Sequence, residues 1–141
     1  MYAKSLIVCF VSYFFSILAG FLSLEFLSLG HLWLNILFAH VIATIVIYIF
    51  SVIYKCSSLY DPFWSVIPCP IFLYLVLYPE IDDSSLLRSL LIGIPISYYV
   101  IRLTWNWLKT WPGLEKEDFR YINLYQTFGN FKWFINFFGI H

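Results

Sequence analysis

Charged side chains are scarce in this sequence. Aspartate, glutamate, lysine and arginine make up 11% of its 141 residues, whereas they make up about a quarter of an ordinary soluble protein. Hydrophobic residues make up 62%, and they are arranged in runs long enough to cross a bilayer, which takes about 20 residues of helix. The sequence therefore excludes an ordinary soluble domain and predicts an integral membrane protein.

Three further absences narrow the possible function. The formal net charge is zero, so no overall field attracts nucleic acid. The three cysteines show no CxxC or Cys/His spacing, which favours neither a disulfide framework nor a metal site. No glycine loop of the GxGxxG or GxxxxGK type is present, so any bound nucleotide must be held by side chains.

We expect an all-α fold, a multi-span bundle of transmembrane helices that forms a single membrane domain over residues 1–141. The predicted spans cover residues 5–24, 30–54, 62–78 and 86–108, followed by a polar segment over 109–130 and the apolar start of a fifth helix over 131–141. Asp61 can cap the third span, with Pro62 at the first helical position. Pro68 and Pro70 lie inside this span and predict a kink or a broken turn.

Basic residues are distributed unequally between the two ends of the predicted spans. Most lysines and arginines lie at the amino terminus, in the loop after the second span and after the fourth span. The positive-inside rule therefore places the amino terminus, the loop 55–61 and the segment 111–132 in the cytoplasm. The expected membrane is the endoplasmic reticulum in a eukaryote and the inner membrane in a bacterium.

The last strongly apolar helix carries polar residues on one face. Arg102, Asn106 and Lys109 are four and three residues apart, so all three project from the same side. A charge inside an apolar span is costly unless it has a partner or a ligand. Arg102 can instead extend its side chain to the interface, but Asn106 gains nothing from that, so we expect the pair to line a polar cavity. Asp61 lies at a similar depth and can share this cavity, unless it serves only as a helix cap.

The fourth helix must end at Trp111-Pro112-Gly113, because proline followed by glycine cannot continue a helix cheaply. A charged and aromatic segment follows, with Glu117, Asp118, Arg120 and Tyr121 at the mouth of the predicted cavity. Carboxylates there can bind ribose hydroxyls, and arginines can bind phosphates. A short mixed run of charges is also the usual sign of a solvated turn, and this alternative stays open.

Three motifs in the second half of the chain resemble those of a known family. They are Tyr60-Asp61-Pro62-Phe63-Trp64-Ser65 with Pro68, then Arg102-Leu103-Thr104-Trp105-Asn106-Trp107, then Trp111-Pro112-Gly113-Leu114 with Glu117-Asp118-Phe119-Arg120-Tyr121. In this order they are similar to the steroid 5-alpha-reductase-like family, and within it to a branch of integral membrane proteins with a domain of unknown function. The resemblance covers residues 60–141. The first two spans resemble the family only in their general apolar character.

The resemblance implies a membrane reductase that passes a hydride from NADPH to an activated carbon–carbon double bond of a lipid or sterol-like substrate. It implies a cofactor side made of Arg102, Asn106, Glu117, Asp118, Arg120 and Tyr121, and a pocket that includes Trp64 and Trp105. Trp105 is also typical of the aromatic belt at a membrane interface. Such a reaction needs an acid near a carbonyl oxygen, for which Tyr60 and Asp61 are the candidates.

Members of that family continue into a carboxy-terminal half that closes over the nucleotide, whereas this sequence stops in the first turns of a fifth helix. We therefore expect a truncated chain, or a half that needs a second polypeptide or an oligomer to complete the bundle. Two other functions stay open. One is a non-catalytic membrane fragment that packs with a partner through interhelical hydrogen bonds, and the other is an enzyme of the related isoprenylcysteine methyltransferase type.

Overall fold

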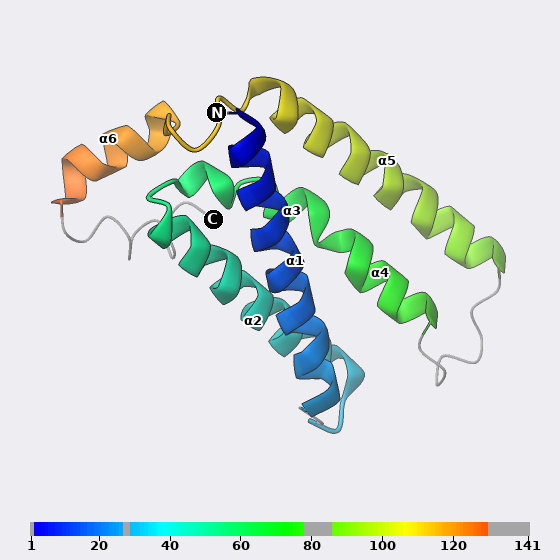
Figure 1. The fold of residues 1–141 in the computed structure, drawn as a ribbon. Helices are drawn as coiled ribbons and strands as arrows, with labels where there is room; N and C mark the ends of the chain where they lie inside the picture. Colours follow the sequence, from blue (N-terminus) through cyan, green and yellow to red (C-terminus); the bar gives the residue numbers. More distant parts are fainter. Residues whose placement is uncertain (1, 27–28, 78–85, 130–141) are drawn as a thin grey trace. The chain divides into compact units, whose positions relative to one another are not determined.

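A computed structural model describes residues 2–26, 29–77 and 86–129, and every regular element in them is helical (Figure 1). The elements are α1 (Tyr2–Phe26), α2 (Leu32–Ile53), the short 3-10 helix η1 (Ser57–Leu59), α3 (Phe63–Val66), α4 (Pro68–Leu77), α5 (Leu86–Thr110) and α6 (Phe119–Phe128). The predicted all-α fold is confirmed, since no strand occurs in these ranges. The chain divides into two compact units, one formed by Met1–Asp61 with Pro112–His141 and the other by Pro62–Trp111.

Four stretches of the described chain are long and apolar enough to cross a membrane, as the sequence predicts. They are Ala3–Phe26, Leu32–Ile53, Ser57–Leu77 and Leu86–Thr110. The predicted start of a fifth helix over residues 131–141 lies outside the described residues, and the single domain over residues 1–141 stays a prediction.

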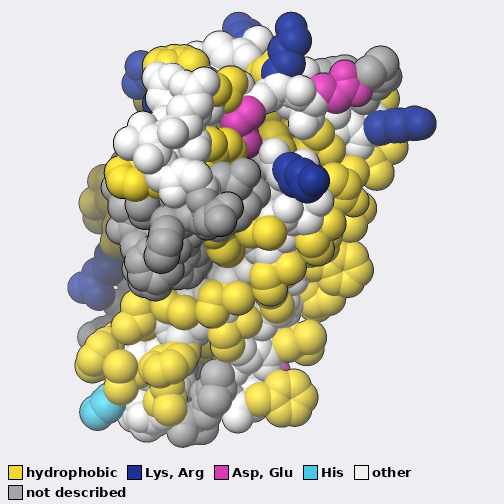
Figure 2. All heavy atoms as spheres, turned by 90° about the vertical axis from the view of Figure 1, so that its left-hand side faces the viewer, with side chains coloured by type: hydrophobic (Ala, Val, Ile, Leu, Met, Phe, Trp, Pro, Cys, Tyr) yellow, Lys and Arg dark blue, Asp and Glu magenta, His cyan; other side chains and the backbone are white. Residues whose placement is uncertain are grey.

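Apolar side chains cover the outer surfaces of these helices. Hydrophobic side chains form much of the surface that Figure 2 shows. Phe10 on α1 is 73% exposed, and no residue of α5 is buried. Exposing so much apolar surface to water would be unfavourable, whereas the acyl chains of a bilayer cover it at no such cost. The surface is therefore that of an integral membrane protein.

Helices α1 and α2 pack against each other through small residues. The Ser16 hydroxyl of α1 donates a hydrogen bond to the carbonyl oxygen of Ala43 in α2 at 2.6 Å. A Cβ atom added to Gly20 would lie 3.2 Å from the carbonyl oxygen of Ala39 and 3.4 Å from the Cβ of Ala43. Small residues let two helices approach this closely, and a hydroxyl that is bonded within the pair has no need of water.

The first half of α1 contacts both polar segments of the first unit. The Leu114 N–H donates to the Ser5 hydroxyl oxygen at 3.2 Å, and the Tyr13 hydroxyl donates to the carbonyl oxygen of Leu59 at 3.1 Å. The start of α1, the loop after α2 and the segment 112–121 thus gather at one end of this unit.

The second unit contains the predicted break in the third span. Helix α3 ends at Val66 and α4 begins at Pro68, because proline offers no N–H to continue the preceding helix. Pro70 falls in the first turn of α4, where a missing N–H costs little. The hydroxyls of Ser65 and Thr104 lie 3.1 Å apart and connect α3 to α5.

Replacing Gly20 by valine is expected to weaken the packing of α1 on α2. The added methyl groups extend beyond a Cβ that already touches the Ala39 carbonyl oxygen, and overpacking of this kind costs about 1–3 kcal/mol. Unfolding titrations in detergent micelles, followed by circular dichroism, measure the difference. The control is Phe10→Val, which places the same residue on the exposed face of α1. If Gly20→Val is no less stable than this control, the close packing is wrong.

Candidate functional site

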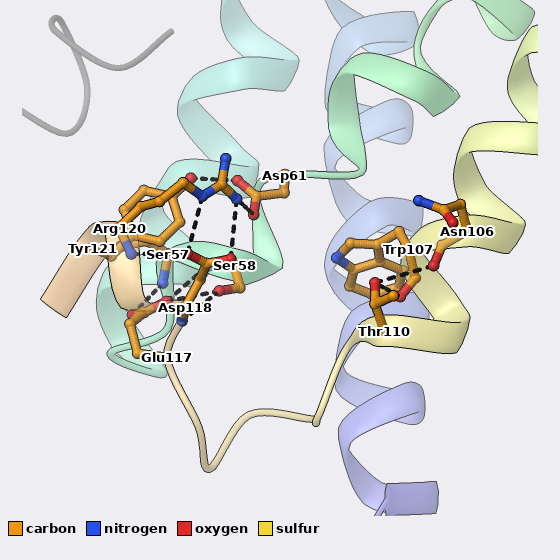
Figure 3. A network of polar contacts seen from close by, with 10 residues as sticks. All are labelled: Ser57, Ser58, Asp61, Asn106, Trp107, Thr110, Glu117, Asp118, Arg120 and Tyr121. Carbon is orange, nitrogen blue, oxygen red and sulfur yellow. Dashed lines mark hydrogen bonds and ion pairs between the residues drawn. The ribbon is translucent and has the colours of Figure 1, made fainter.

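The first contact of the site is a helix cap supplied from a distant segment. Glu117 lies in the turn before α6, and its carboxylate accepts hydrogen bonds from the Ser57 N–H at 2.8 Å, the Ser58 N–H at 3.0 Å and the Ser58 hydroxyl at 2.9 Å (Figure 3). The two serines are the first residues of η1. N–H groups at a helix start have no partner within the helix, so an anion there satisfies them. Glu117 thus ties the segment 112–121 to the loop that follows α2.

Asp118 forms the start of α6. Its side chain accepts a hydrogen bond from the Arg120 N–H at 2.9 Å, as an N-cap residue does. The same carboxylate accepts from the Arg120 guanidinium, from Nε at 2.9 Å and from Nη2 at 3.2 Å. The hydrogen bond from Arg120 holds the pKa of Asp118 below its ordinary value, and the same bond raises the pKa of Arg120. Both side chains are therefore charged and fixed at the start of α6.

Asp61 meets the start of α6 from the end of the loop after α2. Its carboxylate accepts hydrogen bonds from the Tyr121 hydroxyl and from Arg120 Nη2, the latter at 3.3 Å. The interpretation of Asp61 as a helix cap is wrong, because Pro62 occupies the cap position of α3 and no side chain bonds the free N–H groups there. A cation and a hydroxyl at α6 instead offset part of the cost of removing the carboxylate from water.

Two tyrosines of α6 lie against the same loop. Tyr121 is 1% exposed, and its burial, together with the hydrogen bond to Asp61, raises the pKa of its phenol well above the ordinary value. Tyr125, one turn further on, shares a hydrogen bond with the Ser57 hydroxyl, and burial raises its pKa to about 12. Both phenols therefore keep their protons at neutral pH.

This arrangement leaves one cation with spare capacity for hydrogen bonds. The Arg120 side chain is 54% exposed, and its Nη1 bonds to no residue that the structure describes. A guanidinium in this state can bind an anion such as a phosphate. The carboxylates of Glu117 and Asp118, in contrast, already accept hydrogen bonds within the unit, which gives both a structural role. Their contacts with ribose hydroxyls stay predictions.

Two predicted cofactor residues, Arg102 and Asn106, lie in the second unit. Both are exposed on α5, and their side chains make no hydrogen bond or ion pair within the described part of the chain. An arginine inside an apolar span without a partner is open to an anionic ligand or a headgroup phosphate. A cavity shared by Arg102 and Asp61 stays a prediction.

The remaining candidates differ in their surroundings. Tyr60 is buried at the end of the loop after α2. Trp64 is exposed on α3, and Trp105 is exposed on α5 with the ammonium group of Lys109 5.2 Å from its ring centroid. A lysine over an exposed indole is common where a helix leaves the membrane. The pocket roles of both tryptophans stay predictions.

Comparison with known proteins assigns this chain to a family. A family model described as "Protein of unknown function (DUF1295)" matches residues 47–141, which is the larger part of the chain. This chain belongs to the DUF1295 family. No curated protein and no solved structure matches it. The DUF1295 match begins within α2 and runs through α6, so it contains every predicted site residue, whereas α1 precedes it.

Within the DUF1295 match, the first unit brings together five residues that the sequence predicts for the site: Asp61, Glu117, Asp118, Arg120 and Tyr121. Ser57, Ser58 and Tyr125 are not among the residues predicted for the site, and α6 falls in a region predicted only as a polar segment. A pattern in the sequence does predict α6, because an Asp N-cap is followed by apolar and aromatic residues at the spacing of an amphipathic helix: Tyr121, Leu124, Tyr125 and Phe128.

Glu117→Gln is expected to destabilise the first unit by about 1–3 kcal/mol, because a neutral amide offers one acceptor oxygen to three donors and leaves an N–H group of η1 underpaired. The free energy of unfolding in detergent measures this loss, and the Ser57 and Ser58 amide protons should exchange faster. Glu115→Gln makes the same change at an exposed position two residues earlier and should have little effect. Equal stability of the two variants would show that the cap contributes nothing.

Asp118→Asn separates the charge of this residue from its role as a cap, because asparagine also caps helices well. The folded-state pKa of Asp118 lies below the ordinary 3.8. Its charge therefore stabilises the fold above that pH, and the contribution is lost as the pH falls through the folded-state pKa. We expect the wild type to be more stable than the variant at neutral pH, and the difference to disappear in acid. Unfolding curves of both proteins between pH 7 and about 2 test this, and a constant difference would contradict it.

Proposed function

We propose that this chain works as a membrane-embedded reductase, which uses NADPH to reduce an activated carbon–carbon double bond in a lipid or sterol-like substrate. The chain belongs to the DUF1295 family, which is related to steroid 5-alpha-reductase-like proteins. The three motifs that resemble that family fall within the matched residues. Family and motifs support the reaction class, and the identity of the substrate follows from neither.

The observation that carries the proposal is the meeting of Asp61, Arg120 and Tyr121 (Figure 3). Arg120 and Tyr121 are 59 and 60 residues from Asp61 in the sequence, yet all three share one hydrogen-bonded network. This network follows directly after two apolar helices, at the end where the unit carries its polar segments. A cofactor from water and a substrate from lipid can both reach such a position.

The exposed arginines are suited to bind the phosphate groups of a nucleotide. NADPH carries several phosphate groups, which bind best to cations that have free N–H groups. Nε and Nη2 of Arg120 are held by Asp118 and Asp61, while Nη1 is open. A guanidinium that is already fixed loses little freedom on binding, which favours affinity. Arg102 is the second candidate, because its exposed guanidinium bonds to no side chain in the described ranges.

NADPH, when bound, supplies the hydride for the double bond. The chain's own part in the proposed reaction is to bind the cofactor, to orient the substrate and to hold a proton. Tyr121 keeps its proton at neutral pH and donates it in a hydrogen bond to Asp61. Asp61 is the more accessible of the two, with 21% of its side chain exposed, and in its protonated form it can give a proton to a substrate oxygen. Tyr60, the other proposed acid, precedes Asp61 in the same buried stretch.

The proposed orientation has this site in the cytoplasm, as the distribution of lysines and arginines predicts. A cytoplasmic site is open to cellular NADPH, and the lipid or sterol-like substrate reaches it from the bilayer. A second polypeptide or an oligomer that completes the bundle is part of the proposal. The alternative is a non-catalytic membrane protein whose polar network serves only to hold its helices together.

Binding of NADPH tests the proposal directly. The chain is purified in lipid nanodiscs, and NADPH is titrated while the fluorescence of the dihydronicotinamide is followed. We expect saturable binding, at least tenfold weaker in Arg120→Ala, since losing one charge-assisted contact to a phosphate costs about 1.5–3 kcal/mol. NADH should bind less tightly than NADPH.

The matched control is Arg88→Ala, which removes an arginine near the amino end of α5. It should bind NADPH like the wild type. Circular dichroism must show the same helical content for all variants before their affinities are compared. A folded wild-type chain that binds no NADPH, or equal losses in Arg88→Ala and Arg120→Ala, would refute the proposal and favour the non-catalytic alternative.

A further inference from the structure

Helix α6 has an apolar edge that the described part of its unit leaves uncovered. Tyr121 and Tyr125 are four residues apart and face the loop after α2. Phe119 and Ile122, three residues apart on the neighbouring side of the helix, are 71% and 43% exposed. The helix therefore presents one surface packed on the protein, one edge on which the exposed Phe119 and Ile122 flank Gln126, and one polar face.

The polar surface completes this pattern. Arg120, Asn123 and Thr127 are three and four residues apart, so they share a face, and all three are exposed. An apolar edge beside a polar face is the arrangement of helices that lie along a membrane surface, where one side contacts acyl chains and the other contacts water.

The attachment of α6 places it at the boundary of the bilayer. Its first residues bond to the loop after α2 through Glu117, Asp118 and Asp61, and α2 ends at Ile53 after a continuous apolar span. Ten residues of helix extend about 15 Å, which is half of the roughly 30 Å needed to cross a bilayer. In Figure 1, α6 also runs across the direction of α2 rather than along it. An apolar edge at this position meets the lipid interface.

We propose that α6 is an interfacial helix, whose Phe119 and Ile122 side chains insert between lipid headgroups and whose Arg120, Asn123 and Thr127 side chains face water. The partner of this surface is the bilayer itself, and no specific headgroup is required. Phenylalanine and isoleucine gain from leaving water at any such interface. The proposal does not depend on NADPH binding, and it explains why Phe119 and Ile122 stay exposed.

Nitroxide spin labels on α6 test the proposal. Cys9 and Cys69 are changed to serine and the buried Cys56 to alanine, and single cysteines are then introduced as Phe119→Cys, Ile122→Cys, Asn123→Cys and Thr127→Cys. The labelled chains are placed in phosphatidylcholine vesicles. Collision rates of each label with oxygen, which prefers lipid, and with a water-soluble nickel chelate report its depth.

We expect the ratio of oxygen to nickel collisions to be several-fold higher at positions 119 and 122 than at the matched positions 123 and 127. Equal ratios at all four positions would overturn the proposal, because α6 would then lie wholly in water or wholly in lipid. Protection of 119 and 122 from both reagents would also overturn it, since a second copy or another protein would then cover the edge.

A second measurement keeps the test decisive if the cysteine-free chain does not fold. Phe119→Trp and Asn123→Trp are made in the otherwise unchanged chain, and their fluorescence is compared with that of the wild type in vesicles with and without brominated phosphatidylcholine. Bromine on the acyl chains should quench the additional tryptophan at position 119 and not the one at 123. The same quenching at both positions would refute the interfacial helix.

Discussion

The structure of the first unit depends on one carboxylate that lies far from its partners in the sequence. Glu117 satisfies two backbone N–H groups at the start of η1, and Ser57 lies 60 residues before it. Ser57 and Ser58 are buried in the folded chain, so leaving their backbone N–H groups unpaired would cost free energy. Because Glu117 makes these bonds, the segment before α6 is fixed beside α2. Only then can Asp61 meet Arg120 and Tyr121.

Hydropathy and a few helix-breaking residues predict most of the fold. Long apolar runs give the spans, Pro68 marks the break between α3 and α4, and Trp111-Pro112-Gly113 marks the end of α5. These features are local, so the sequence carries them directly. The partner of Asp61 is not local. An aspartate before a proline suits a helix cap by its neighbours alone, and only a residue 60 positions later decides that its carboxylate bonds elsewhere.

Five of the residues predicted for the site lie in one unit, and their hydrogen bonds could not be predicted from the sequence. Glu117, Asp118, Arg120 and Tyr121 can be read as ligand-binding residues because of their chemistry, and the fold does bring them to Asp61. Their neighbours Ser57 and Ser58 give no signal in the sequence, because small polar residues are ordinary in loops. Pairing within the site occupies the carboxylates, and it leaves Nη1 of Arg120 without a hydrogen bond to any described residue. This pairing is the reason to propose an anion rather than a hydroxyl group as the ligand.

The order in which the chain is synthesised adds a constraint on the loop after α2. Helices α1 and α2 pack through Ser16, Gly20 and Ala43, all of which precede the loop, so the two can leave the translocation channel as one hairpin. The residue that completes η1 is made 60 residues later than Ser57. Until then the exposed N–H groups of this loop must bond to water. The hairpin must therefore hold its loop at the membrane surface from the outset, and the Glu117 carboxylate replaces that water when it arrives.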